Sequence, residues 1–256
     1  MAFSNKWINI LNRVDDICSQ IRMPWFRGHS NTDYQLSSGL FRNRNSHEIS
    51  TIINHERAYY REFLHNGHAH HSQTDWNLLY LMQHHGVSTR LLDWTESFSV
   101  ALYFAFKDWD SHNNACVWIL DPFELNLKTK NNQLYYIPYE GAPYEDFLYK
   151  DESFFEYSVA LFPIRNSNRL IAQQGVFTLQ GNKGVPLDQE HYGRLVKEDA
   201  LVKIELTQDI KDDVGDFLYL SGVTEHTLFP DMDGLSRSMK KDRAYSTSRV
   251  IYSDTK

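Results

Sequence analysis

Apolar residues recur at helical spacing in four stretches of the first half of the chain. These stretches are residues 7–18, 52–64, 76–83 and 100–105. Asn66-Gly67 is expected to end the second helix and Gly86 the third, because glycine is favoured just after a helix. Ser97 is placed to cap the fourth helix, since its side chain can accept a hydrogen bond from an unpaired backbone N–H group.

Four other runs are rich in β-branched and aromatic residues, which is typical of strands. They cover residues 25–29, 115–120, 176–180 and 201–206. Helices dominate the first part of the chain, most of the strands follow, and no linker or internal repeat divides it. The pattern predicts a single α+β domain over residues 1–256, opened by an N-terminal helix within residues 1–22.

The segment 83–97 lies between two predicted helices and carries an unusual density of polar chemistry. It contains two histidines, an arginine, an aspartate, a tryptophan and several hydroxyl side chains. Polar groups on a loop with rigid flanks are a common way to build a site, so we expect an irregular loop with functional residues. Asp93 stands between two apolar residues and is expected to be partly buried, with Arg90 or Arg27 as its partner.

The candidate binding groups each have a structural alternative. Arg27 can hold a phosphate bidentately beside Gly28, which lets a ligand approach, or it can pair with a carboxylate. Trp94 can present a flat face to a base or a nicotinamide ring, or it can pack in the core. Thr95 and Ser97 can donate to ribose or phosphate oxygens, or they can cap a helix.

Composition narrows the class of protein. The chain has 256 residues, of which 41% are hydrophobic and 23% charged, as in ordinary globular domains. A net charge of -7 means that nucleic acid would have to bind a local basic patch. Two cysteines provide neither a disulfide framework nor a zinc cluster. The N-terminus lacks a signal-peptide pattern and no apolar run approaches the roughly 20 residues of a membrane span, so we expect a soluble, cytoplasmic protein.

Familiar catalytic motifs are missing from the sequence. It contains no Walker loop, dinucleotide G-x-G-x-x-G, nucleophile elbow or H-E-x-x-H. The tightest histidine group, His68, His70 and His71, has no carboxylate or thiolate at ligand spacing, and a solvated loop is the simpler interpretation. No metal site is predicted, and a nucleotide would have to be bound by some other arrangement.

Two segments stand apart in composition. Residues 126–150 are rich in Asn, Lys and Tyr and too long for an ordinary connection, which predicts a functional lid or an insertion. Residues 237–256 form a tail with several Lys and Arg residues. Basic and aromatic side chains together suit single-stranded nucleic acid, whereas a packed flap and a solvated tail are the structural alternatives.

Six ordered blocks make the chain resemble the FRG-domain family over most of its length. The blocks are Phe26-Arg27-Gly28, residues 36–42, residues 83–86 with 89–95, residues 101–105, Arg169 with residues 173–177, and residues 222–223 with 228–231. The resemblance implies a single FRG domain over residues 1–256, with residues 126–150 as an insertion or lid and residues 237–256 as a basic tail.

The order of these parts is similar to that of ADP-ribosyltransferases. This implies an α+β fold with a split of small, mostly antiparallel sheets flanked by helices, and NAD in the cleft between them. By the same analogy Arg27, Gln174 and Asp93 would be catalytic, with Gln173, Gln174 or Glu225 at the place of the usual glutamate. The residues implied to bind NAD are Phe26, Gly28, His29, Thr89, Arg90, Trp94, Thr95, Ser97 and Gln173.

FRG-domain proteins resemble bacterial toxins and phage-defence effectors. The resemblance therefore implies an NAD-dependent mono-ADP-ribosyltransferase toxin that modifies single-stranded RNA, such as mRNA, in anti-phage defence. An antitoxin and, by the same analogy, a chaperone are implied as protein partners. Two alternatives stay open: a metal-dependent nuclease or hydrolase that uses Asp93, Glu96 and the histidines, and a non-catalytic sensor that binds NAD or another nucleotide.

Overall fold

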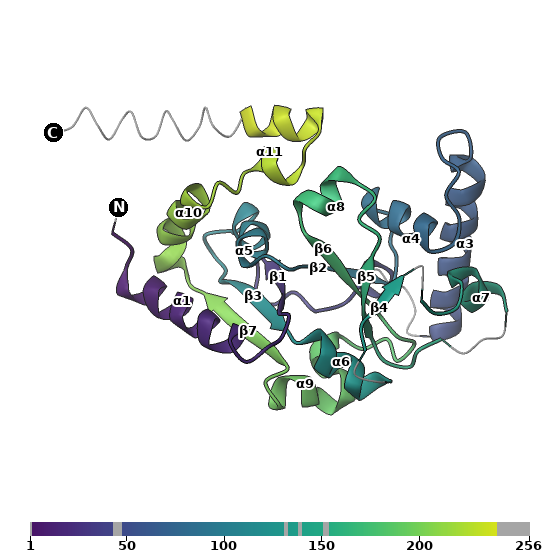
Figure 1. Ribbon diagram of the computed structural model, residues 1–256, viewed down its shortest axis with the longest axis horizontal. Coiled ribbons are helices and arrows are strands. Elements are labelled where there is room, and N and C mark those ends of the chain that lie inside the picture. The colour runs from purple at the N-terminus through teal and green to yellow at the C-terminus, as the bar shows by residue number, and fades with distance from the viewer. Residues whose placement is uncertain (1, 43–47, 131–132, 138–139, 151–153, 240–256) are drawn as a thin grey trace.

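The computed structural model describes residues 2–42, 48–130, 133–137, 140–150 and 154–239. Its centre is a seven-stranded sheet with the strand order β4-β5-β6-β2-β1-β3-β7 (Figure 1). The strands are β1 Trp25–His29, β2 Leu91–Thr95, β3 Ala115–Leu120, β4 Tyr135–Ile137, β5 Val159–Pro163, β6 Gly175–Leu179 and β7 Leu201–Leu206. All neighbours pair antiparallel except β4 and β5, which are parallel. The prediction of a mixed domain with mostly antiparallel strands is confirmed.

The helices surround this sheet. They are α1 Asn5–Cys18, α2 Gly39–Arg42, α3 Ile49–Gly67, α4 Asp75–His84, α5 Phe98–Lys107, α6 Pro122–Thr129, α7 Tyr144–Tyr149, α8 Asn168–Ala172, α9 Arg194–Lys197, α10 Lys211–Leu220 and α11 Glu225–Leu228. Two 3-10 turns lie at Leu187–Gly193 and Gln208–Ile210. The predicted helix starts and ends agree well, and Ser97 caps α5 by accepting from the Val100 N–H group. Among the described residues, no helix has the length and apolar character needed to cross a membrane.

Apolar packing places different helices on the two ends and the two faces of the sheet. The β1-β3-β7 end packs on α1, α5 and α10, with Phe26 and Val117 among the buried residues. The β5-β6-β2 end packs on α3, α4 and α7. Neighbouring residues on a strand point to opposite faces, so Trp25 lies in a different cluster from Phe26, together with Trp94 and with residues of α6 and α9.

The joint between β1 and β2 divides the sheet. Strands β1 and β3 pair at five positions, as do β2 and β6, but β1 and β2 share the single pair Phe26–Thr95. The guanidinium of Arg27 enters the gap and donates from Nη1 to the backbone oxygen of Asp93 at 2.5 Å. The sequence predicted two small sheets; the described strands instead form one sheet whose two halves meet at one backbone pair.

Two predictions for the segment 83–97 were wrong. Residues 91–95 are not an irregular loop but the central strand β2, because four of these side chains are buried and the backbone pairs along β6. Asp93 is exposed rather than partly buried, and neither Arg90 nor Arg27 holds its carboxylate.

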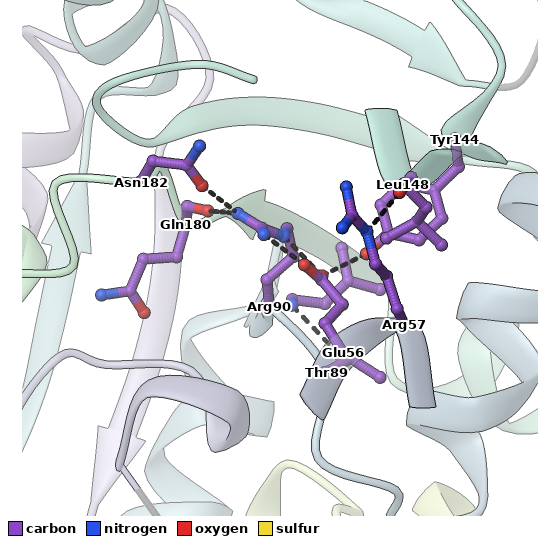
Figure 2. A network of polar contacts seen from close by, with 9 residues as sticks. Glu56, Arg57, Thr89, Arg90, Tyr144, Leu148, Gln180 and Asn182 are labelled. Carbon is purple, nitrogen blue, oxygen red and sulfur yellow. Dashed lines mark hydrogen bonds and ion pairs between the residues drawn. The ribbon is translucent and has the colours of Figure 1, made fainter. Parts of the chain in front are cut away.

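Arg90 instead lies in a buried polar network (Figure 2). Its Nε donates to Oε1 of Glu56 on α3 at 2.5 Å, and its Nη1 donates to the backbone oxygen of Gln180 at 2.9 Å. The hydroxyl of Tyr144 on α7 donates to the same Glu56 carboxylate. Burial of this charge pair is tolerated because nearly every donor and acceptor is satisfied. The network ties β2 to α3 and α7.

The segment 126–150, predicted as a lid or insertion, contains the end of α6, the edge strand β4 and the helix α7. Tyr144 is completely buried against Tyr60 and Trp76. Helix α7 is therefore packed on α3 and α4, and the role of the segment as a lid stays a prediction. Most of the predicted basic tail, residues 240–256, lies outside the described residues.

Candidate functional site

A pocket of about 530 Å³ opens at the joint between β1 and β2. Its walls come from both strands, the segment 30–42, the turn 83–88, and the helices α5 and α8. Besides His29, four lining residues have basic or carboxylate side chains: Arg27, Arg42, Asp93 and Arg169. Three guanidinium groups against one carboxylate, among the described lining residues, make this a pocket suited to an anionic ligand.

Arg27 and His29 form one unit on β1. The Arg27 Nε donates to Nε2 of His29 at 3.0 Å, so the imidazole carries its proton on Nδ1. Burial first, and then the charge of Arg27, lower the pKa of His29 to about 3. Burial also lowers the pKa of Arg27 to about 10, against the opposing effect of Asp93. Near neutral pH the pair is therefore a fixed arginine cation beside a neutral histidine.

Asp93 lines the pocket, and a hydrogen bond holds its carboxylate in place. The Gln83 Nε2 donates to Oδ2 of Asp93 at 2.8 Å. The Thr89 hydroxyl in turn donates to Oε1 of Gln83 at 2.6 Å. Asp93 is the one acidic residue among the described residues that line this pocket. The arrangement offers a single oriented carboxylate among cations.

Helix α8 closes the opposite side. The Arg169 guanidinium lies 4.7 Å from the centre of the Phe229 ring, and burial lowers the pKa of Arg169. The Gln173 side chain donates to the backbone oxygen of Leu228, while its own backbone oxygen accepts from the Thr95 hydroxyl at 2.7 Å. These bonds fix α8 between β2 and the 225–229 segment.

A second pocket of about 260 Å³ adjoins the first, and Gln83, Asp93, Arg169 and Gln173 line both. Its other walls include Tyr80, whose ring stacks on Phe177 with a centre-to-centre distance of 5.6 Å. Gln, Asn and Ser side chains make up much of the remaining lining. The two spaces meet at Asp93, so a group held in one can contact a group held in the other.

Most of the predicted site residues come together here. Those that line the larger pocket are Phe26, Arg27, Gly28, His29, Asp93, Trp94, Thr95 and Gln173. Residues from β1, from β2 and from the end of α8, far apart in the sequence, therefore share one wall.

Four predicted residues are not part of either lining: Thr89, Arg90, Ser97 and Gln174. Thr89 is buried behind Gln83, and Arg90 belongs to the network with Glu56. Ser97 caps α5, and Gln174 has a φ of 46° in the turn that leads into β6.

Two candidates, Trp94 and Glu225, have side chains that make structural contacts. The Trp94 indole is buried and donates from Nε1 to the Thr178 hydroxyl at 3.1 Å, so its ring belongs to the core. Glu225 is buried and accepts from Arg237 Nε at 2.9 Å and from the Tyr103 hydroxyl. It does not line either pocket.

The structure gives a steric reason for glycine at position 28, which the sequence alone did not reveal. A Cβ atom at this position would lie 1.8 Å from the Ala101 backbone oxygen and 2.6 Å from the Ala105 nitrogen. The glycine thus permits close contact between β1 and α5, and the backbone that approaches it is that of a helix.

Sequence reasoning gave no role to Gln83, Arg42 or Arg169 as site residues. Gln83 and Arg169 stand in the motif blocks, and Arg42 ends another block, but only the fold brings them to one pocket. The histidine-rich segment 68–71 is far less informative: His71 stacks on Phe63 at 5.5 Å. Within the described ranges, no three His, Cys, Asp or Glu residues are grouped so as to hold a metal ion.

Comparison with known proteins adds one match. Residues 22–114 match the family model of the FRG domain. This range includes β1, β2 and α5, and with them Arg27, Gln83 and Asp93. The resemblance drawn from the motifs is confirmed for this part of the chain. No curated protein and no solved structure gave a significant match.

Proposed function

We propose that this protein is an NAD-dependent mono-ADP-ribosyltransferase and that the pocket between β1 and β2 is its NAD site. The observation that carries the proposal is the break in the sheet, where Arg27 enters the gap and three arginines line one pocket together with a single aspartate. The resemblance to ADP-ribosyltransferases implied an arginine on the first core strand beside the NAD cleft, and Arg27 on β1 lines this pocket.

The positive charge of the pocket indicates where the pyrophosphate of NAD would bind. Arg27, Arg42 and Arg169 would hold the pyrophosphate, since a guanidinium fork matches phosphate oxygens and is always charged. His29 takes one donor of Arg27 and so limits the orientations of the remaining N–H groups. Binding energy spent on the pyrophosphate would fix the distance between the ribose and the catalytic carboxylate.

Asp93 is the residue that can assist the transfer. The reaction breaks the bond between ribose C1′ and the nicotinamide nitrogen, and nicotinamide leaves with the electron pair. The acceptor forms a new bond to C1′ and loses a proton, which Asp93, a lining residue of both pockets, would accept. A carboxylate nearby also stabilises the positive charge that develops on the sugar.

Neither Gln173 nor Gln174 takes the place of the usual catalytic glutamate. Gln173 already donates to Leu228, and Gln174 does not line the pocket. Asp93 therefore takes the acidic role, and we retain Arg27 as the essential binding group.

We further propose that the acceptor is single-stranded RNA and that the protein acts as a toxin in anti-phage defence, restrained by an antitoxin. Support for RNA comes from the exposed Tyr136, which stacks on Phe162 and could present a face to a base. Arg237 gives less support, because it is paired with Glu225.

The decisive experiment is release of nicotinamide from labelled NAD, with RNA or protein as acceptor. Arg27→Ala should reduce the rate at least about 100-fold, because it removes an oriented cation next to the proposed phosphate site. Arg194→Ala is the matched control: Arg194 is exposed, pairs with Glu198 on α9, and should leave the rate unchanged. A wild-type protein that releases no nicotinamide with any acceptor would contradict the proposal.

A nucleotide sensor is the second candidate, favoured by the lack of a glutamate among the described residues that line the pocket. It predicts that NAD raises the melting temperature with no turnover. The same sample therefore separates the two functions when thermal shift and nicotinamide release are measured together.

A further inference from the structure

We infer that Thr89 and Gln83 are positioning residues that orient the Asp93 carboxylate; their catalytic effect rests on the function proposed above. Three side chains form a chain of hydrogen bonds from the core to the pocket. Thr89 donates to Gln83, and Gln83 donates to Asp93. Thr89 was predicted to contact the ligand. Here it acts on Asp93 indirectly, through Gln83.

The surrounding hydrogen bonds determine which group donates and which accepts along the series from Thr89 through Gln83 to Asp93. The Leu91 N–H donates to the Thr89 Oγ1 at 3.1 Å, so the hydroxyl proton is left to point elsewhere. It points to the Gln83 Oε1, at 2.6 Å. With Oε1 turned to Thr89, the amide NH₂ of Gln83 must face Asp93. The opposite amide orientation would place two acceptors 2.8 Å apart.

Burial makes Thr89 a fixed anchor for an exposed group. Its side chain is 2% exposed and stands just before β2, while Asp93 is solvent-exposed in the middle of that strand. Gln83, at the end of α4, bridges the two. An exposed aspartate without such a partner would populate several rotamers, and each unproductive one lowers the rate.

The chain also distinguishes the two carboxylate oxygens. Gln83 occupies Oδ2 of Asp93, which leaves Oδ1 to accept the proton from the acceptor. As that proton moves, the acceptor bonds to ribose C1′, the bond from C1′ to nicotinamide breaks, and its electron pair leaves with nicotinamide. Thr89 and Gln83 exchange no atoms in this step, which is why we assign them positioning alone.

The test combines NMR of the Gln83 side-chain amide with nicotinamide release in the full chain. The Gln83 signals are assigned by their loss in Gln83→Met. Thr89→Val keeps the side-chain shape but removes the hydroxyl, and should move these signals towards those of a solvent-exposed glutamine. It should also lower kcat about tenfold, equivalent to one lost hydrogen bond, with the KM for NAD unchanged. Thr89→Ser keeps the hydroxyl and should restore both.

Thr129→Val is the matched control, because Thr129 donates to the Ser158 backbone oxygen away from both pockets. If Thr89→Val leaves the Gln83 signals unchanged, the hydrogen-bond chain is wrong. If the signals move while kcat does not, the positioning role is wrong. If Thr89→Val fails to fold, Gln83→Met supplies the kinetic comparison. A wild-type protein without nicotinamide release refutes the proposed function, and the NMR signals then decide the hydrogen-bond chain alone.

Discussion

Arg27 and His29 point to the same face of β1 and meet through their side chains. The imidazole acts as an acceptor, so it restrains the guanidinium without adding a second positive charge. A histidine that stayed protonated here would repel Arg27 and could not accept from it. The chemistry of the pocket thus depends on a histidine kept neutral by burial and by its neighbour.

The stability of the protein should depend on pH through His29. Since the pKa of His29 falls to about 3 on folding, the unfolded chain binds this proton at a higher pH than the folded one. The free energy of unfolding should therefore fall as the pH drops from about 6.5 towards 3.

NMR chemical shifts of the His29 imidazole report the protonation state of the ring directly. The ring should stay neutral, with the proton on Nδ1, throughout the range from pH 8 to 5. Arg27→Met should raise the pKa of His29 only part of the way, because burial remains. A midpoint above about 5.5 in the wild-type protein would show that burial does not hold the ring neutral.

Among the contacts between helices and strands, the close packing of α5 on β1 shapes the wall of the pocket. Helix α5 crosses the strand where Gly28 leaves room for the Ala101 backbone. The same helix contributes Ala101 and Phe104 to the pocket. The depth of the pocket is therefore linked to the absence of one side chain on β1.

Gly28→Ala should be strongly destabilising, by at least about 3 kcal/mol, since the backbone atoms it meets cannot move away as a flexible side chain can. Urea unfolding measures the loss. Gly39→Ala is the control, because its Cβ would lie 3.4 Å from the nearest atom, and it should change stability by less than about 1 kcal/mol. Equal effects at the two glycines would refute the close-packing argument.

Periodicity predicted the four helices α1, α3, α4 and α5 and the four strands β1, β3, β6 and β7, but it missed the short helices and failed at β2. The run from Leu91 to Thr95 includes an exposed aspartate, and a five-residue strand beside a polar turn has too short a pattern to be recognised. The edge strand β4 was missed for a similar reason: it has three residues.

The site residues could be predicted only in part, because contacts between distant segments decide the role of each residue. Arg27 and Arg90 have the same chemistry in sequence, and only the position of Glu56, 34 residues from Arg90, shows which arginine is neutralised in the core. Arg169 and Gln83 reach the pocket through contacts between elements that no local pattern encodes. Sequence thus located the segments that form the pocket better than it assigned their individual roles.

The whole molecule depends on the buried network around Arg90, which joins one half of the sheet to α3 and α7. Arg90→Met should cost about 3–5 kcal/mol in urea unfolding, because it leaves the Glu56 charge buried without its partner. Combining it with Glu56→Leu should recover part of the loss. Asp209→Asn, which breaks the exposed pair with Lys6, should cost less than about 1 kcal/mol. A double variant no more stable than Arg90→Met would argue against a charge-burial cost.

The break between β1 and β2 also bears on how the chain avoids pairing with itself. Two strands that run side by side within one sheet would ordinarily complete their ladder, and open strand edges tend to recruit other chains. Arg27 lies in this gap and donates to the Asp93 backbone oxygen, and a charged side chain in this place disfavours further pairing of β1 with β2 or with an outside strand. The space for a ligand is thus maintained by the side chain that would bind it, and a smaller apolar residue at this position would favour closure of the pocket.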